Sequence, residues 1–513
     1  MRNKIYLTGI LLLVIGLSFS RAFVSISYVI LIATWLADRN VFKKFGEFFR
    51  NKPALVLTSI YLMHLGGLLY TSDFEYAWLD IRTKVPILIL PLVFSTMKPL
   101  SKKEFIAVLI IFSLSVVASF GTSLYFLFTD SPVDFRETFH FVSHIRLSLM
   151  AVIAISVFVW LSFSRKADLP LWTKAAFMLL SGFLLWAVIV LEVMSGMLLF
   201  LLTSVIISFI YIFSGTKGRS KLYISSGVLI TTGFILVYLW TVIASYNHVP
   251  PDNTTGKTTA HGNRYVNLEK DFPVENGSPI GRAVCWKEMK QGWNQRSDIS
   301  FDSLDRNGNK LKYTLLRYLN SKHLSKDYEG MKKLTIEDIK NIEQGFANEE
   351  YTKKFSIKKR IYKVLWEYNI YEKGGNIQRS SGIKRLFLWE TGIDLIKQNP
   401  LFGVGTGDVK KAFEKQLEKE GSPLAGAGLR SHNQFITIAV VFGVSGLLWF
   451  VFALFYPFIK MKHFEFLFLV FFVTYVLSMF WEDSLETQIG VTIFAFFYPF
   501  YLFLNPYYKK HEI

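Results

Sequence analysis

Residues 430–456 read RSHNQFITIAVVFGVSGLLWFVFALFY, and this stretch decides how the chain is organised. A polar segment ends in its first four residues, and the apolar run that follows is long enough to cross a membrane, which takes about 20 residues. If the run is one helix, Ala439, Gly443 and Gly446 lie within roughly 40° of His432 around the helix axis. Small residues at such spacing let another transmembrane helix approach closely. We therefore expect His432 to lie at the outer end of a close helix–helix contact and to face protein rather than lipid. The alternative is an interfacial histidine beside an ordinary packing seam.

The whole chain has the composition of a polytopic membrane protein. Of its 513 residues, 51% are hydrophobic, 16% are aromatic and 19% are charged. The first apolar run follows Arg2 and Lys4, as in a signal peptide, but no convincing small-residue cleavage site follows it, so we expect it to be retained. The predicted spans cover residues 5–19, 22–37, 53–70, 83–97, 105–128, 142–163, 172–193, 196–213, 222–244, 432–458, 463–481 and 485–504.

The net charge of +18 invites a nucleic-acid interpretation, but its distribution favours a membrane topology instead. Basic residues crowd into alternate short segments, which marks the cytoplasmic side of a membrane. The short segments on the other side hold few basic residues, namely Arg21, Arg82, Lys84, Arg136 and Arg146. Both termini are therefore predicted to be cytoplasmic, with the long segment 245–431 outside. The single cysteine, Cys285, excludes an intrachain disulfide.

These patterns predict an all-α membrane bundle of about twelve transmembrane helices with a large, mainly helical outer loop domain. The parts are residues 1–244, the loop domain 245–431, and residues 432–513. Within the loop we expect several local elements: a hairpin around Arg306–Asn309, a capping box at Thr335–Asp338, and helices over Lys353–Tyr371, Ser380–Gln398 and Val409–Glu420. The basic and aromatic helix over Lys353–Tyr371 suits either the bilayer surface or packing on its own domain.

Basic side chains gather at the predicted outer membrane face. They are His144 and Arg146 at the start of the sixth span, Arg430 and His432 at the start of the tenth, and Lys384 and Arg385 on the helix before it. Cations at one membrane face suit an anionic group, and the planar fork of arginine suits phosphate in particular. Interface anchoring with contacts to lipid headgroups is the alternative.

Two further patterns are weaker. The segment Pro400–Asp408 reads PLFGVGTGD, and backbone amides in such a glycine-rich turn can bind phosphate, although a plain turn is favoured. Acidic residues in predicted outer turns are Asp73, Glu75, Glu482 and Asp483. They could bind a divalent cation, although acidic outer turns are common without one. The sequence shows no P-loop, no zinc-ligand spacing and no Asp-x-Asp motif.

Three segments resemble a known family. His432-Asn433 followed by Gly443-Val-Ser-Gly446 is similar to the His-Asn/Ser and Gly-x-x-Gly signature of the O-antigen ligase and polymerase superfamily. Arg385-Leu-Phe-Leu-Trp389, followed by the glycine-rich segment at 400–407, resembles the part of that family's outer loop that leads to the histidine. Glu482-Asp483-Ser-Leu-Glu486-Thr-Gln488 looks like a motif of a subgroup with an enlarged loop.

The resemblance implies a GT-C-like glycosyltransferase of the bacterial inner membrane with a periplasmic loop. It would transfer a glycan from undecaprenyl pyrophosphate to a hydroxyl of a glycolipid or glycan, such as lipid A-core, with inversion and without metal, nucleotide or other cofactor. The implied catalytic residues are His432, as general base, and Arg385. The implied pyrophosphate- or acceptor-binding residues are Arg146, Arg430, His144, Asn433, Glu482 and Asp483.

One departure and several alternatives remain. Family members often carry a Ser-Arg pair where this chain has Met194-Ser195-Gly196-Met197, and Arg146 is a candidate for the missing charge. A polymerase, which extends one lipid-linked glycan with another, and a protein O-glycosylating enzyme share the same motif. From other classes, a transporter or flippase would place ionisable residues near the midplane in related halves, and a sensor would need a cytoplasmic output domain. Neither pattern is evident.

Overall fold

Helices dominate the structure. The computed structural model describes residues 2–130, 135–164, 166, 169–213, 219–249, 257–353, 356–373, 380–462 and 465–507. The sheet within these residues consists of two short antiparallel strands, β1 (Val274–Glu275) and β2 (Ser278–Pro279). The expected all-α class is therefore confirmed.

Every apolar run predicted as a span overlaps a helix. These helices are α1 (Arg2–Phe19), α2 (Arg21–Leu36), α4 (Lys52–Gly66), α5 (Phe74–Thr96), α6 (Lys102–Asp130), α7 (His144–Phe163), α8 (Leu171–Val190), α9 (Met194–Phe213), α10 (Arg219–Asn247), α18 (Gln434–Met461), α19 (Phe466–Ser478) and α20 (Gln488–Phe503). Among the described residues, eight helices are long and apolar enough to cross a membrane. Helices α19 and α20 are apolar but shorter, and α2 meets α3 (Val41–Arg50) at a bend of 105°. The protein is thus a multi-pass membrane protein, and the count of twelve spans stays a prediction.

The chain divides into two compact units. Unit 1 comprises Met1–Leu229 and Arg385–Ile513, and unit 2 comprises Ile230–Lys384. Most of the predicted loop 245–431 therefore belongs to unit 2. Its last part, which contains most of α16 (Ser381–Gln398) and all of α17 (Val409–Lys419), packs with unit 1. The outer location of 245–431 stays a prediction.

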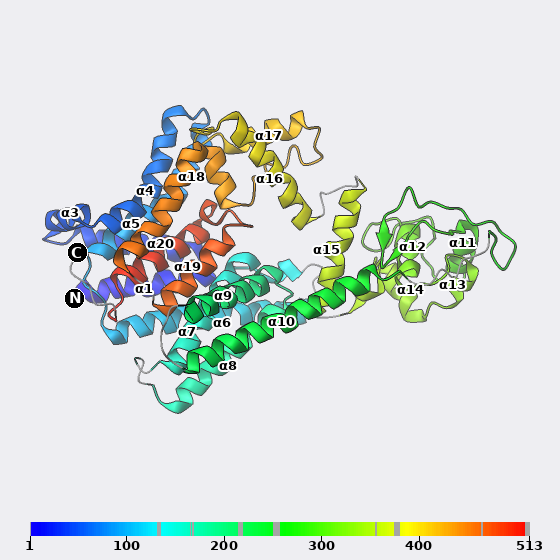
Figure 1. Cartoon of the computed structure of the whole chain (residues 1–513), viewed down its shortest axis with the longest axis horizontal. Coiled ribbons are helices and arrows are strands. Elements are labelled where there is room, and N and C mark those ends of the chain that lie inside the picture. Colours follow the sequence, from blue (N-terminus) through cyan, green and yellow to red (C-terminus); the bar gives the residue numbers. More distant parts are fainter. Residues whose placement is uncertain are drawn as a thin grey trace. The chain divides into compact units, whose positions relative to one another are not determined.

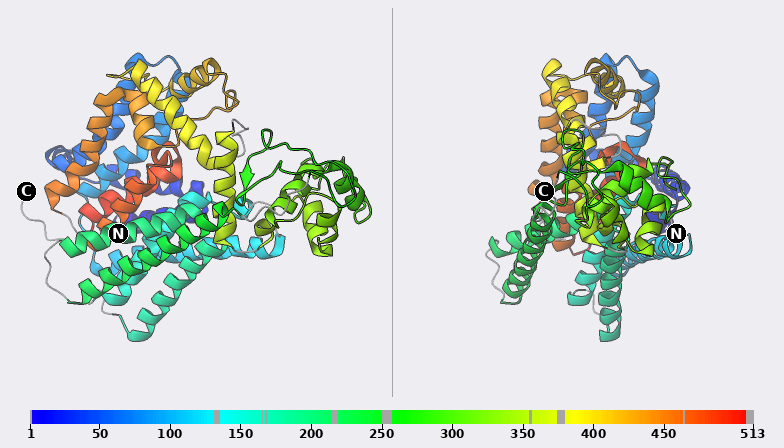
Figure 2. Two further views of the ribbon diagram at one scale, coloured as in Figure 1. Left: turned by 45° about the vertical axis from the view of Figure 1, so that its right-hand side comes forward. Right: turned by 90° about the vertical axis from the view of Figure 1, so that its right-hand side faces the viewer.

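Helix α20 forms the centre of unit 1. All of its residues from Ile489 to Phe503 are buried, as expected for a helix that is apolar on every side. It packs against α5, α19 and α1 (Figure 1). Aromatic rings lock these contacts, including Phe94 against Phe496 at 5.8 Å and Phe471 against Phe497 at 5.6 Å between ring centroids. Helices α7, α8 and α9 run side by side in the same unit (Figure 2). This packing fixes the turn between α19 and α20, where the candidate site lies.

Helix α18 is broken in the middle. Gly443 has φ 69° and ψ −173°, which is outside the helical region and suits glycine alone. The backbone of Leu401 occupies the space beside it, since a Cβ added to Gly443 would lie 2.3 Å from that backbone. The helix starts at Gln434, so His432 precedes it. The predicted alignment of His432 with the glycines around one continuous helix is therefore wrong. A helix does approach further along, where Met63 Sδ of α4 lies 3.6 Å from an added Cβ on Gly446.

The glycine-rich segment 400–407 forms hydrogen bonds with the backbone groups of α18 that the break leaves without helical partners. The amides of Val404 and Gly405 donate to the carbonyls of Val440 and Val441, both at 2.9 Å, and the amide of Val444 donates to Pro400 at 2.8 Å. Inside a membrane protein such freed backbone groups must find partners, and the inserted segment supplies them. Glycine at 405 permits its φ of 96°.

The remaining amides of the segment are also engaged. Gly403 donates to the Asn399 carbonyl at 3.2 Å, and Gly407 donates to Thr71 Oγ1 at 2.8 Å. The glycine amides of this turn are thus used within the fold, which agrees with the favoured alternative of a structural turn; phosphate binding by the turn stays untested.

Unit 2 is a small domain with its own core. Helices α11 (Trp286–Asn294), α12 (Leu311–Ser321), α13 (Tyr328–Lys332) and α14 (Ile336–Glu343) surround buried residues such as Trp293 and Leu315. The predicted capping box of Thr335 and Asp338 is present at the start of α14. The predicted hairpin is reduced to one antiparallel bridge, Leu304 to Lys310, because α12 begins at the next residue.

Helix α15 (Ile357–Glu372) corresponds to the predicted basic and aromatic helix. Its Ile361 and Tyr362 are buried against Val242 and Tyr246, which belong to the same unit. The packing agrees with the alternative that this helix rests on its own domain.

Candidate active site

The turn between α19 and α20 places one carboxylate between two arginines. Glu482 Oε1 lies 3.4 Å from Arg146 Nη2, and Glu482 Oε2 lies 3.4 Å from Arg385 Nη2. Arg146 is oriented further, because its Nε donates to Thr487 Oγ1 and its Nη1 donates to Ser143 Oγ, both at 2.8 Å. The two arginines lie near the starts of helices α7 and α16, so residues far apart in the sequence meet at this turn.

The next carboxylates along the turn hold Arg430. Its Nε lies 3.3 Å from Asp483 Oδ2, and its Nη1 lies 3.3 Å from Glu486 Oε2. Nη1 also donates to the Tyr76 hydroxyl at 2.6 Å. Two carboxylates thus neutralise one guanidinium group. Arg430 therefore braces the turn, whereas Arg146 and Arg385 share a single carboxylate.

Sequence reasoning missed a buried chain of charges behind this turn. Lys84, whose side chain is 0% exposed, forms ion pairs with Asp80 and, at 3.0 Å, with Glu486. Asp80 Oδ2 also lies 3.0 Å from His64 Nδ1. Lys84 is counted with the outer segment by the sequence prediction, although it lies at the edge of the predicted span 83–97. The Asp80-Lys84 spacing of i, i+4 was the available signal, since opposite charges at that spacing can neutralise each other on a buried helix face.

His432 occupies the apex of a tight turn just before α18. Its φ is 51°, a left-handed conformation that is uncommon for residues other than glycine and costs about 1–3 kcal/mol. The hydroxyl of Ser431 bridges the turn, donating to the Asn433 carbonyl at 2.8 Å and accepting from the Asn433 amide at 3.1 Å. Asn433 then caps α18 and donates through Nδ2 to the Phe480 carbonyl at 2.9 Å. The half-buried imidazole is thus presented on a braced backbone.

Asp483 is buried beside Arg430. Burial raises the pKa of the Asp483 carboxyl, and the nearby charge of Arg430 opposes this shift. Asp483 also accepts a hydrogen bond from Thr437 Oγ1 at 2.8 Å. Glu482 and Asp483 are consecutive residues. One short turn therefore contacts Arg146 and Arg385 through Glu482 and Arg430 through Asp483.

The structure brings most of the predicted site residues to this turn. They are His432, Asn433, Arg430, Arg385, Arg146, Glu482 and Asp483. His144 begins α7 two residues before Arg146, and its ring packs against Phe139 at 5.9 Å between centroids. A role for His144 in binding stays a prediction, as do the roles of the other residues.

The structure bears on the missing Ser-Arg pair. Gly196 follows Ser195 at the start of α9, and a Cβ added to Gly196 would lie 2.7 Å from Ser148 Cβ of α7. Ser148 follows Arg146 by two residues. Gly196 therefore packs against the helix that carries Arg146, and the replacement of the missing arginine by Arg146 stays a prediction.

The acidic residues are engaged by cations rather than grouped together. Asp73 Oδ2 lies 3.1 Å from Lys411 Nζ, while Glu482 and Asp483 face arginines. Across the described ranges, no three or more His, Cys, Asp or Glu side chains are grouped as a metal site would require.

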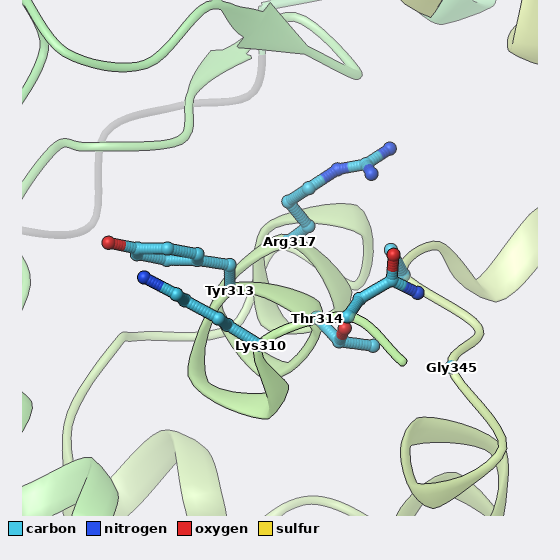
Figure 3. Close-up of a pocket in the computed structure, with 7 residues that line it drawn as sticks. Lys310, Tyr313, Thr314, Arg317 and Gly345 are labelled. Carbon is cyan, nitrogen blue, oxygen red and sulfur yellow. The ribbon is translucent and has the colours of Figure 1, made fainter. Parts of the chain in front are cut away.

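Unit 2 contains a cavity of about 340 Å³. Figure 3 shows Lys310, Tyr313 and Arg317 among its lining side chains. The charge of Arg317 is already neutralised, because its Nε and Nη2 each lie 2.9 Å from an oxygen of Glu275. None of the predicted site residues lines this cavity.

Comparison with known proteins agrees with the motifs. A family model described as O-antigen ligase matches residues 335–451, which include Arg385, the inserted glycine segment, Arg430 and His432. No curated protein matches the chain. Residues 335–451 therefore carry an O-antigen ligase family domain, and this match supports the resemblance of the chain to the O-antigen ligase and polymerase superfamily.

Proposed function

We propose that this protein is a membrane glycosyltransferase of the ligase kind, which moves a glycan from undecaprenyl pyrophosphate to a hydroxyl of a lipid A-core or similar acceptor. The observation that carries the proposal is the convergence of Arg146 and Arg385 on Glu482, in a turn that follows the helix end to which Asn433, the neighbour of His432, is hydrogen bonded. Guanidinium groups and an imidazole match what the reaction needs: charge stabilisation for a leaving pyrophosphate and a base for a hydroxyl.

In this mechanism, the acceptor oxygen attacks the anomeric carbon of the donor. Its proton passes to the neutral imidazole of His432, while the bond from the anomeric carbon to the pyrophosphate oxygen breaks on the opposite face. The sugar configuration therefore inverts. The negative charge that develops on undecaprenyl pyrophosphate is stabilised by Arg146 and Arg385. Stabilisation of this kind contributes about 10²–10³ in rate for each well-placed donor.

The other residues of the turn have supporting roles in this proposal. Arg430 is satisfied by Asp483, Glu486 and Tyr76, so we assign it to bracing the turn rather than to binding pyrophosphate. Asn433 fixes the start of α18 against the end of α19. Both keep the imidazole of His432 in place.

The proposed topology puts this site at the periplasmic face of the bacterial inner membrane. Both termini are then cytoplasmic and 245–431 is periplasmic. The starts of α7, α18 and α20 and the end of α19 would lie at that same face, where the lipid-linked donor is presented. Labelling of single cysteines introduced into the polar turns of a Cys285→Ser background, with a membrane-impermeant reagent, tests this orientation.

The activity is tested with purified protein, a defined glycan on polyprenyl pyrophosphate, and lipid A-core as acceptor. We expect transfer by the wild type and a loss of about 10²–10⁴ for His432→Ala, the range for a general base. His261→Ala in unit 2 is the matched control and should keep full activity. Equal transfer by His432→Ala and wild type, in protein that remains monodisperse, would refute the assignment.

The same assay separates the alternatives. Extension of one lipid-linked glycan by another, without transfer to lipid A-core, identifies a polymerase. A polymerase uses the same donor chemistry, so the assigned residues keep their roles. Movement of intact lipid-linked glycan across a proteoliposome membrane without any new glycosidic bond identifies a transporter and contradicts the proposal.

A further inference from the structure

Glu482 differs from the other carboxylates of the turn in what holds it. Among the described residues, its side-chain hydrogen bonds go to Arg146 and Arg385, each at 3.4 Å. Asp483 is fixed by Thr437, and Glu486 is fixed by Lys84 and Gln434. Charge-assisted hydrogen bonds between arginine and carboxylate are typically about 2.7–2.9 Å long. Glu482 is therefore the loosely held member of the group.

The geometry of Glu482 resembles that of a bridging anion. One carboxylate oxygen faces each guanidinium group, so a single negative side chain spans two cations. The Arg146 and Arg385 side chains are 16% and 26% exposed, which leaves them accessible from outside the packed core. Without a counter-charge, two guanidinium groups in this setting would repel each other. An incoming anion with two phosphoryl groups presents the same arrangement of charge.

We propose that Glu482 is an exchangeable internal counter-anion for the pyrophosphate site. It holds Arg146 and Arg385 in position while the site is empty, and it is displaced when the donor's pyrophosphate binds. After transfer, its return to the arginines favours release of the lipid pyrophosphate. This inference rests on the proposed function for the identity of the anion. It adds a competitor, built into the chain, that sets how tightly that anion is held.

The test measures anion binding apart from catalysis. Full-length protein in nanodiscs is titrated with inorganic pyrophosphate by calorimetry. Glu482→Gln removes the charge but keeps the size of the side chain, and we expect it to bind pyrophosphate about tenfold more tightly, as expected for the removal of one competing ion pair. Arg385→Gln is expected to bind it more weakly than the wild type. Orthophosphate should gain less from Glu482→Gln, since a single phosphoryl group spans the two arginines less well.

Glu75→Gln is the matched control. Glu75 is exposed in the first turn of α5, and this variant removes one negative charge from the predicted outer face without touching the arginine pair. We expect unchanged pyrophosphate affinity. A gain in Glu75→Gln equal to that in Glu482→Gln would reduce the effect to net charge and overturn the inference.

Failure of the inference and failure of the proposed function are distinguishable. If Glu482→Gln keeps its melting temperature and binds pyrophosphate no better than the wild type, Glu482 is a structural ion-pair partner and the inference is wrong, whatever the transfer assay shows. If Glu482→Gln binds pyrophosphate more tightly but the wild type transfers no glycan, the exchangeable anion site stands and the glycosyltransferase assignment fails.

Discussion

Two arginine–carboxylate groups in this molecule differ in how complete they are. In unit 2, Arg317 makes two 2.9 Å hydrogen bonds to Glu275 and stacks on Trp366 at 3.7 Å. Glu275 is fully buried. In unit 1, Glu482 is divided between two arginines, with one 3.4 Å contact to each. In the complete pair one carboxylate balances one guanidinium group, whereas in the divided group one carboxylate is shared by two. We propose that this difference distinguishes a structural arginine from one that binds an anionic ligand.

Among the variants that test this comparison, the largest effect is expected when one arginine of the divided group is removed. Arg385→Gln and Arg146→Gln should each lower glycan transfer by about 10²–10³, because each removes one group that stabilises the developing pyrophosphate charge. The melting temperature of Arg385→Gln should stay close to that of the wild type, because Arg385 is partly exposed and its ion pair with Glu482 is long. Arg146→Gln also loses the hydrogen bonds to Thr487 and Ser143 and should melt somewhat lower. Transfer assays and thermal unfolding of the same preparations provide both measurements. A large fall in melting temperature with full activity per folded molecule would show that these arginines stabilise the fold and do not act in transfer.

The opposite pattern is expected for the complete group. Arg317→Gln leaves Glu275 as a buried carboxylate without its cation, which typically costs about 3–5 kcal/mol of stability. Unit 2 should then unfold at lower temperature or become sensitive to protease, while donor hydrolysis or transfer by molecules that remain folded changes little. Limited proteolysis followed by mass spectrometry locates the effect. The double variant Arg317→Met with Glu275→Leu should recover much of the loss, because it removes both charges.

The sequence carried most of the fold and part of the site. Each of the twelve apolar runs predicted as a span overlaps a helix in the structure. The predicted capping box of Thr335 and Asp338 lies at the start of α14. The site residues followed from a motif resemblance and from basic residues near span ends. These patterns are local, and local patterns are what one sequence shows directly.

What the sequence could not show was which charges pair. Lys84 was counted with the outer segment, and its neutralisation by Glu486 is a contact between residues far apart in the chain, which one sequence does not show. The break at Gly443 was hidden for the same reason. Nothing within the apolar run indicates that Pro400–Gly405 satisfies the freed backbone groups.

A smaller effect is expected at this break. Gly443→Ala places a Cβ in a left-handed conformation and 2.3 Å from the backbone of Leu401. Strain of this kind costs about 1–3 kcal/mol, and more if the inserted segment is expelled. We expect a lower melting temperature and weaker transfer, because the segment precedes Arg430 and His432 in the same unit. Gly121→Ala on α6, where an added Cβ meets nothing within 4 Å, is the matched control.

The smallest effect concerns Asp408, which anchors the inserted segment to the turn before α5. Burial opposes ionisation, but hydrogen bonds from Ser72, Thr71 and the Asp73 amide hold the pKa of Asp408 below its usual value. A carboxyl whose pKa is lower in the folded state contributes stability above its unfolded pKa of about 3.9, and that contribution is lost as pH falls through the folded value. Asp408→Asn should therefore melt a few degrees below the wild type at pH 7, and the difference should shrink as the pH falls below about 3.9 and through the lower folded pKa of Asp408. A difference that stays constant over this acidic range would show that the anchor depends on shape rather than charge. Asp408 would then resemble the Arg317–Glu275 pair in being purely structural. Unlike that pair, it would stabilise the fold through its shape and hydrogen bonds and not through its charge.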